Sequence, residues 1–147
     1  MYISTKTGYA LRAMIELALT DDEQPLSITE LASRQQLPSK YLERLFSLLK
    51  KSELVKSRKG TNGGYLLARN ADTITLQDVM HAVEEAHYYS YCRHNKIDAE
   101  YCQGLSCHLR GFWDKIGTDL ETYFSNINLQ SIINKYIRGD HEANLFE

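Results

Sequence analysis

The chain has 147 residues, of which 43% are hydrophobic, and a formal net charge of -2 at pH 7. This length and composition supply one hydrophobic core without a disulfide framework. No apolar run reaches the length that spans a membrane, and residues 1–14 lack the apolar stretch and cleavage site of a secretory signal. We therefore expect a cytoplasmic protein with one domain, a helical appendage and no membrane partner.

Charge is divided unevenly along the chain. Residues 1–70 carry 11 Lys or Arg and 7 acidic residues, whereas residues 71–147 carry 6 and 12. The positive excess is greatest between Lys40 and Lys59, where seven cations accompany two acids. Such local charge favours binding to the phosphates of a nucleic acid, although a solvated helix face would have the same composition.

A helix-turn-helix is predicted near the N-terminus. Residues 6–19 repeat apolar side chains at helical spacing, and either Ser4 or Thr5 fits the N-cap. Ser27 and Glu30 have the spacing of a capping box, which predicts a second, short helix. A tight turn and a third helix follow, and this order is typical of helix-turn-helix proteins.

The third helix and the residues after it carry the functional prediction. The helix start is left open between Pro38 in the first turn and Ser39 as the cap. Two short strand-like runs around a glycine-rich tip, within residues 54–67, predict a hairpin that makes the motif winged. Spacings of three and four in the helix predict an inward apolar face made of Tyr41, Leu42, Leu45, Phe46, Leu48 and Leu49.

After the wing, a helix is expected from Thr73 to about Glu85. Residues 86–107 are then polar, aromatic and without periodicity, and they are longer than a structureless loop usually is in a compact domain. In a reducing compartment a group of cysteines favours metal or redox chemistry over structural disulfides, so this stretch is a candidate sensor loop. It holds all three cysteines of the chain, Cys92, Cys102 and Cys107.

Residues 105–137 form a second amphipathic region with an apolar stripe that a domain of this size hardly covers by itself. We predict that the stripe is the interface of a homodimer; a helix folded back over its own core is the alternative. Residues 138–147 are expected to be a flexible tail, and residues 1–85 a winged helix-turn-helix domain. The predicted interface residues are Leu109, Phe112, Trp113, Ile116, Leu120, Tyr123 and Phe124.

Four sequence motifs occur in order along most of the chain: ISTKTGYAL at residues 3–11, YLERLF at 41–46, GTNGGYLL at 60–67 and ITLQDV at 74–79. Together with cysteines just before a long helix, they resemble the Rrf2 family of bacterial winged-helix transcription regulators, which includes the IscR, NsrR and CymR types. The resemblance implies a mainly α fold with a small β wing. It also implies a transcriptional regulator, expected to be a repressor, and not an enzyme.

The resemblance further implies a homodimer that binds double-stranded DNA at a partly palindromic operator, with recognition helices about 34 Å or a multiple of it apart. Arg44 fits bidentate pairing with guanine, and Glu43 can accept a hydrogen bond from cytosine. Lys59 stands where the family places a cation in the minor groove, and glycines at the tip let the backbone approach phosphates. The predicted DNA-binding residues are Lys6, Ser39, Lys40, Tyr41, Glu43, Arg44, Lys50, Arg58, Lys59, Gly60, Gly63 and Gly64.

The three cysteines are the ligand type that iron-sulfur clusters require. Family members that carry a two-iron two-sulfur (2Fe-2S) cluster use three such cysteines, so the resemblance implies that Cys92, Cys102 and Cys107 hold one. A CymR-like protein would instead lack the cluster and respond through a thiol switch, a small ligand or a partner protein. Zinc suits cysteine and histidine as well, but the close cysteine pair usual in structural zinc sites is absent from the sequence.

The fourth cluster ligand is left open. IscR-type proteins have a histidine three residues after the last cysteine, where this chain has Arg110, and NsrR-type proteins use an aspartate at the position of Gly8. The candidates for the fourth ligand are His108 or His94, with Glu85 or a small external thiol as further alternatives. The same histidines could serve as the base of a cysteine-dependent enzyme, but no phosphate-loop or catalytic motif accompanies them.

Overall fold

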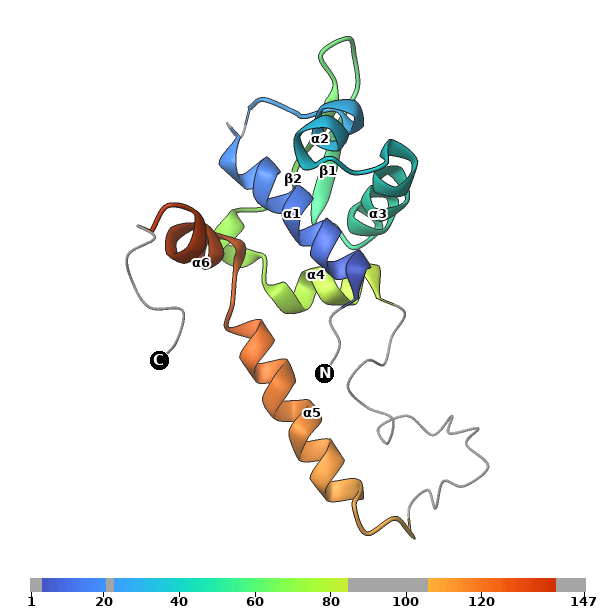
Figure 1. Cartoon of the computed structure of the whole chain (residues 1–147), viewed down its shortest axis with the longest axis vertical. Helices are drawn as coiled ribbons and strands as arrows, with labels where there is room; N and C mark the ends of the chain where they lie inside the picture. The colour runs from blue at the N-terminus through green and yellow to red at the C-terminus, as the bar shows by residue number, and fades with distance from the viewer. Residues whose placement is uncertain (1–3, 21–22, 85–105, 140–147) are drawn as a thin grey trace.

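The computed structural model describes residues 4–20, 23–84 and 106–139. These ranges form a mainly helical protein with a small antiparallel β wing, which confirms the predicted fold class. The elements, shown in Figure 1, are α1 (Thr5–Leu19), α2 (Ile28–Gln35), α3 (Ser39–Lys51), β1 (Val55–Arg58), β2 (Gly64–Leu67), η1 (Ala71–Thr73), α4 (Leu76–Val83), α5 (Arg110–Ser125), α6 (Leu129–Ile132) and η3 (Ile133–Ile137).

Local capping explains where the first two helices begin. Ser4 caps α1 by accepting a hydrogen bond from the backbone N–H of Thr7 at 3.4 Å. The capping box predicted for α2 is complete, because Ser27 Oγ accepts from the Glu30 N–H at 3.2 Å and the Glu30 carboxylate accepts from the Ser27 N–H at 2.8 Å. Both caps satisfy backbone donors that the first turn of a helix leaves unpaired.

Five helices close around one core. Side chains from α1, α2, α3, α4 and α6 meet in it, and Met14, Leu31, Phe46, Val79 and Leu129 are fully buried. The structure thus places α6 against the N-terminal helices, although its residues fall within the range 105–137 in which dimerisation helices were predicted. We call α1 to α4, the wing and α6 the head.

The helix α3 buries one face and leaves the other free. It begins at Ser39 with Pro38 in the N-cap position, so both predicted alternatives were wrong: the proline is the cap, and the serine is in the first turn. Leu48 departs from the predicted inward stripe, because it lies at the edge of the stripe and is 39% exposed. The buried members of the stripe are Leu42, Leu45, Phe46 and Leu49.

Backbone contacts fasten the wing to the rest of the head. Leu26, in the connection between α1 and α2, exchanges two backbone hydrogen bonds with Tyr65 of β2, at 3.0 and 2.8 Å. A Cβ atom at Gly64 would lie 2.4 Å from the Leu26 carbonyl oxygen. Glycine at position 64 therefore allows this close approach of the two backbones.

The helix after the wing begins later than predicted. α4 starts at Leu76 rather than at Thr73, because Thr75 is its N-cap and Asp78 completes a capping box. The Asp78 carboxylate accepts hydrogen bonds from the Thr75 N–H at 3.0 Å and from Arg69 Nη2 at 3.1 Å. The segment that leaves β2 is in this way tied to the start of α4.

The long helix α5 joins the head at one end only. Near its C-terminal end Phe124 packs with Leu76 and Met80 in a second, smaller core. From there α5 projects away from the head, and its N-terminal end lies farthest out (Figure 1). It begins at Arg110, later than the predicted start at residue 105. Within the described ranges, no helix combines the length and apolar character needed to cross a membrane.

Candidate nucleic-acid interface

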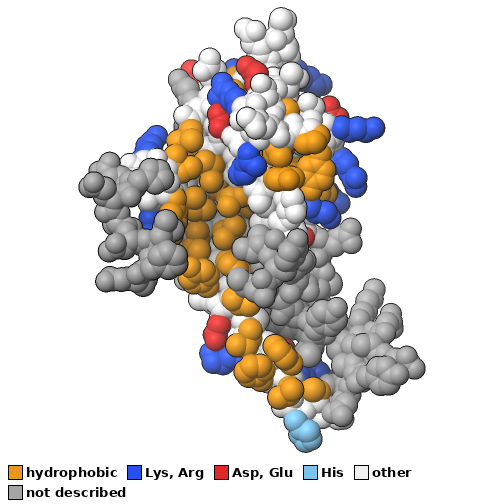
Figure 2. Space-filling view, viewed as in Figure 1, with side chains coloured by type: hydrophobic (Ala, Val, Ile, Leu, Met, Phe, Trp, Pro, Cys, Tyr) orange, Lys and Arg blue, Asp and Glu red, His pale blue; other side chains and the backbone are white. Residues whose placement is uncertain are grey.

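The outward face of α3 presents charged side chains that the head does not use. Lys40, Glu43 and Arg44 are exposed, and none of them makes a hydrogen bond or ion pair with a described residue. Because they are three and four residues apart, they lie on the same side of the helix. Figure 2 shows Lys and Arg side chains projecting from the edge of the head beside α3. This face offers the donors and acceptors that read base edges in a DNA groove.

Three other predicted contact residues lie on α1 and α3. The ring of Tyr41 meets the edge of the Tyr9 ring with a centroid separation of 5.7 Å, so much of Tyr41 packs α3 against α1. Lys6 is exposed in the first turn of α1 and has no partner among the described residues. Ser39 is exposed in the first turn of α3, next to the charged face.

The wing tip is a tight turn closed by its own backbone. Gly60 has φ of 119°, a conformation that side chains disfavour, and its carbonyl accepts a hydrogen bond from the Gly63 N–H at 2.9 Å. A Cβ atom at Gly63 would lie 2.5 Å from the Arg58 carbonyl oxygen. Contacts within the protein therefore account for the glycines at 63 and 64. Lys59 is exposed at the base of this turn without a described partner.

Two of the predicted DNA-binding cations have partners within the head. Lys50 Nζ donates to Ser57 Oγ at 2.7 Å, which joins the last turn of α3 to β1. Arg58 Nη2 donates to the Glu23 carbonyl oxygen at 2.7 Å, which joins β1 to the connection between α1 and α2. Both side chains belong to exposed residues, so the hydrogen bonds orient them without burying them.

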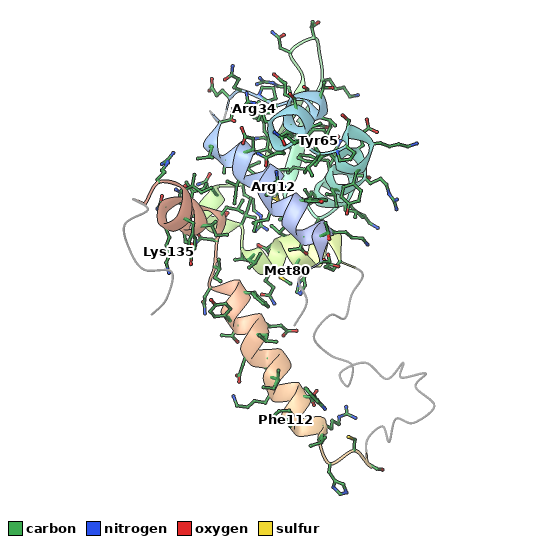
Figure 3. The ribbon with its side chains drawn as sticks, viewed as in Figure 1. Arg12, Arg34, Tyr65, Met80, Phe112 and Lys135 are labelled. Carbon is green, nitrogen blue, oxygen red and sulfur yellow. The ribbon has the colours of Figure 1, made fainter. Side chains whose placement is uncertain are left out.

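A polar network that the sequence did not reveal holds the helix-turn-helix in shape. Arg12 donates to the backbone carbonyl of Gln35 at 2.6 Å and to its side-chain oxygen at 3.1 Å. Glu16 accepts from Arg34 and from the Gln35 side chain, each at 2.9 Å. Figure 3 labels Arg12 on α1 and Arg34 on α2. These bonds fix the turn before α3 against α1, and their wide sequence separation left no local signal.

The structure describes one of the three cysteines. Cys107 is a free, partly exposed cysteine just before α5, and its carbonyl oxygen accepts a hydrogen bond from the Arg110 N–H at 3.1 Å. Cys92, Cys102 and the candidate ligand His94 lie outside the described residues. Of the predicted metal ligands, Cys107 and His108 are therefore the ones whose surroundings the structure describes.

Side chains near Cys107 do not by themselves make a metal site. His108 is exposed, and Arg110 Nε lies 3.8 Å from a carboxylate oxygen of Asp114. Arg110, at the position of the IscR-type histidine ligand, is thus oriented toward an acid one turn along α5. Within residues 4–20, 23–84 and 106–139, no three His, Cys, Asp or Glu side chains come together in a way that would hold a metal ion.

The apolar stripe of α5 divides into an exposed and a buried part. Phe124 differs from the prediction that it contacts a second copy, because it is 3% exposed and packs against Leu76 and Met80 of its own chain. Leu120 is partly buried against the same small core. Figure 3 shows Phe112 near the free end of α5 and Met80 at the junction with the head. The exposed members are Leu109, Phe112, Trp113, Ile116 and Tyr123, between 39% and 63% accessible.

Comparison with known proteins identifies relatives across nearly the whole chain. The model of the Rrf2 family, described as "Iron-dependent Transcriptional regulator", matches residues 3–135. The HTH-type transcriptional regulator IscR of Photorhabdus laumondii is 34% identical over 141 residues, which cover 91% of this chain and 80% of that protein. IscR of Escherichia coli K12 is 33% identical over the same length and covers 81% of the relative.

Solved structures of IscR and CymR also resemble this chain over most of its length. T. potens IscR superposes with a TM-score of 0.74 and 28% identity over 98% of this chain and 94% of that one. CymR, described as the global cysteine regulator of B. subtilis, superposes with a TM-score of 0.73 and 30% identity over 91% and 97%. These relatives are regulators rather than enzymes. The chain belongs to the Rrf2 family of winged-helix, DNA-binding transcriptional regulators.

Proposed function

We propose that two copies of this chain form a dimer that represses transcription at a partly palindromic operator, according to the state of its cysteine segment. The observation that carries the proposal is the charged face of α3, where Lys40, Glu43 and Arg44 have no partner among the described residues. Their hydrogen-bonding groups are free for bases and phosphates. Because its partner is chromosomal DNA, we place the protein in the cytoplasm.

Each side chain of this face suits a particular contact. Arg44 has the fork of donors that pairs with the two acceptors of guanine, and Glu43 accepts from the amino group of cytosine. A good bidentate pair discriminates against the wrong base by about 1–3 kcal/mol. Lys59, free at the wing, is suited to a phosphate or to the narrow minor groove beside the site.

The dimer is supported by the free end of α5. Leu109, Phe112, Trp113 and Ile116 are large, apolar and exposed within neighbouring turns of one helix. Aromatic and aliphatic clusters of this kind are typical of the buried centres of homodimer interfaces. Figure 2 shows hydrophobic side chains along the visible side of α5 as far as its free end. A second copy that covers this stripe would pair two heads with the two-fold symmetry of a palindromic operator.

The cofactor proposal depends on the chemistry of the donors. Three thiolates from Cys92, Cys102 and Cys107 fit a 2Fe-2S cluster, and the free, partly exposed cysteine at position 107 is consistent with this use. His108 or His94 would complete the ligand set, since Arg110 cannot. When bound, the cluster would make the cysteine segment sensitive to iron supply and oxidation.

The chain itself offers a route from Cys107 to the head. Cys107 lies just before the free end of α5, and the other end of α5 is packed on α4 through Phe124 and Leu76. A rigid helix held at one end transmits a displacement of its other end. A change at the cysteine segment would therefore change the angle between the head and the dimer interface, and with it the affinity for an operator of fixed spacing.

A cluster-free regulator is the second candidate. The absence of the IscR-type histidine at Arg110, together with the likeness to CymR of B. subtilis, supports a thiol switch or a partner protein in place of a cluster. On this proposal oxidation would join two of the three cysteines in one dominant disulfide.

Anaerobic purification tests the cofactor and the DNA-binding role together. We expect a coloured protein that contains iron and that retards a duplex recovered by selection from a random-sequence pool. A colourless, iron-free protein from iron-replete cells that still binds this duplex would exclude the cluster and favour the thiol switch, which mass mapping after oxidation would then test. If no duplex is retarded in any redox state, the DNA-reading face is wrongly assigned.

A further inference from the structure

Arg58 in the wing makes a side-chain hydrogen bond to the head, and its predicted role as a DNA contact does not explain this bond. Arg58, the last residue of β1, donates from Nη2 to the backbone carbonyl oxygen of Glu23 at 2.7 Å, across 35 positions of sequence. The residue that follows it, Lys59, is exposed and has no partner among the described residues. Neighbouring cations at the wing tip thus have different environments, one directed at the protein and one free.

Side chains on the two faces of β1 reach two different parts of the head. Successive side chains of a strand point to opposite faces. Ser57 accepts a hydrogen bond from Lys50 of α3 at 2.7 Å, while Arg58 reaches the connection between α1 and α2 on the other face. β1 is therefore tied to the head on both sides just before the tip. Lys56, on the same face as Arg58, is exposed and has no described partner.

These ties matter because the hairpin is short. β1 and β2 have four residues each, and an isolated two-stranded hairpin is only marginally stable in water. The exchange between Leu26 and Tyr65 anchors β2, at the residue that pairs with Ser57 of β1. The side of the tip that carries Lys59 is oriented by the side-chain bonds of β1.

We infer that Arg58 is a positioning residue for DNA binding, which braces the wing against the Glu23 carbonyl and acts on the duplex through Lys59. The inference rests on the proposed contact of Lys59 with DNA. It reassigns Arg58 from the predicted DNA-contacting set to the support of that set. A direct phosphate contact by the other donors of the Arg58 guanidinium is the competing role, and a double-mutant cycle separates the two roles.

The experiment compares full-length wild type, Arg58→Ala, Lys59→Ala and the double variant on a duplex selected by the wild type from a random-sequence pool. Dissociation constants are measured over a range of salt. We expect each single variant to bind about threefold to tenfold more weakly, and the double variant to bind like Lys59→Ala. The salt slope should fall by about one phosphate, roughly 0.9, in all three variants, because all three lose the same contact.

Lys56→Ala is the matched control, since it removes the same charge from the same face of β1 without removing a brace. The fold loss in affinity from Lys56→Ala should multiply with the fold loss from Lys59→Ala in the double variant. Arg58→Met provides a second variant if Arg58→Ala does not fold, because it keeps the aliphatic stem and removes only the donors. Combined with Lys59→Ala, it should also give a double variant that binds like Lys59→Ala. Thermal midpoints of all variants would show that the head is intact.

The outcomes separate this inference from the proposed function. If the losses from Arg58→Ala and Lys59→Ala multiply and the slope of the double variant falls twice as far, Arg58 touches DNA itself and the inference is wrong. Wild-type binding by both Arg58 variants would also overturn it. If Lys59→Ala binds like the wild type, the proposed contact of Lys59 fails and the inference fails with it. If the wild type retards no duplex, the proposed function fails.

Discussion

The two ends of α5 differ in the exposure of their aromatic side chains. Phe124, at the end joined to the head, is 3% exposed, whereas Phe112, near the free end of the same helix, is 55% exposed. The first completes a core with Leu76 and Met80 of its own chain, and the second has no such neighbours within the described core clusters. The comparison teaches that the two ends of one helix differ in role: one end completes the fold of the head, and the other leaves an apolar surface exposed.

The strongest test of this comparison is the removal of each ring. Phe124→Ala should reduce the free energy of unfolding by about 3–5 kcal/mol, because it opens a cavity between α4 and α5. Urea unfolding at a protein concentration too low for dimers would measure this loss. Phe112→Ala is the matched control and should change the stability of the monomer little. Equal losses from the two variants would mean that the free end is also packed on its own chain.

The next largest effect is expected at the exposed stripe. Ile116→Glu places a charge among the apolar residues and should weaken dimerisation by about 2–4 kcal/mol, as at a buried interface centre. Sedimentation equilibrium would measure the dissociation constant of the dimer. Lys115→Ala changes the adjacent exposed residue, which pairs with Asp119 of the same helix, and should leave the dimer intact. A dimer unaffected by Ile116→Glu would assign the stripe to another partner.

A change on α3 should affect DNA reading without affecting assembly. Arg44→Ala is expected to weaken binding to the selected duplex by roughly 1–3 kcal/mol and to relax the base preference at one position. Competition with single-base variants of the duplex would show both effects. Lys51→Ala removes an exposed cation from the last turn of the same helix and should weaken all sequences alike. A sequence-independent loss from Arg44→Ala would make it a phosphate contact.

A smaller effect is expected at the turn between α2 and α3. Gln36 has φ of 52°, a left-handed conformation that favours glycine. Gln36→Gly should therefore raise the free energy of unfolding of the head by about 0.5–1 kcal/mol and leave dimerisation unchanged. Ser33→Gly, within α2, should lower it by about as much, because glycine disfavours a helix. Thermal unfolding of the two variants should thus shift in opposite directions.

The smallest effect concerns pH. A hydrogen bond from the Ser27 hydroxyl, then one from the Ser27 N–H, lowers the pKa of Glu30 below its ordinary value of 4.5. A carboxyl with a lowered pKa stabilises the fold above its ordinary pKa, and this contribution is lost as the pH falls through the folded value. Wild type should therefore exceed Glu30→Gln in stability at neutral pH, and the difference should shrink in acid. A difference that grows in acid would contradict the sign.

Local sequence signals predicted much of the head. The capping box of Ser27 and Glu30 and the spacing of Leu42, Leu45 and Leu49 each depend on residues within a turn or two. The glycines of the wing tip likewise mark a turn that their neighbours require. These features could be predicted from the sequence because each depends on residues close together in the chain.

Contacts between distant parts of the chain could not be read in the same way. The bond from Arg58 to Glu23, the bonds of Arg12 to Gln35 and the burial of Phe124 beside Met80 all join separate elements. Helical periodicity places both Phe124 and Phe112 in the apolar stripe. The periodicity shows which side chains share a helix face, but it does not show what packs against that face. For the same reason the sequence could not show that α6 packs into the head.

The backbone exchange between Leu26 and Tyr65 has a consequence for the length of DNA that one head spans. It joins the connection before α2 to the strand β2 by two backbone hydrogen bonds, and the close approach at Gly64 leaves no room for a side chain between them. On the proposed docking, the distance from the groove occupied by α3 to the groove beside the wing is therefore set by the protein. An operator with a base pair inserted between these two points should lose one contact or the other, and no adjustment of the wing should restore both.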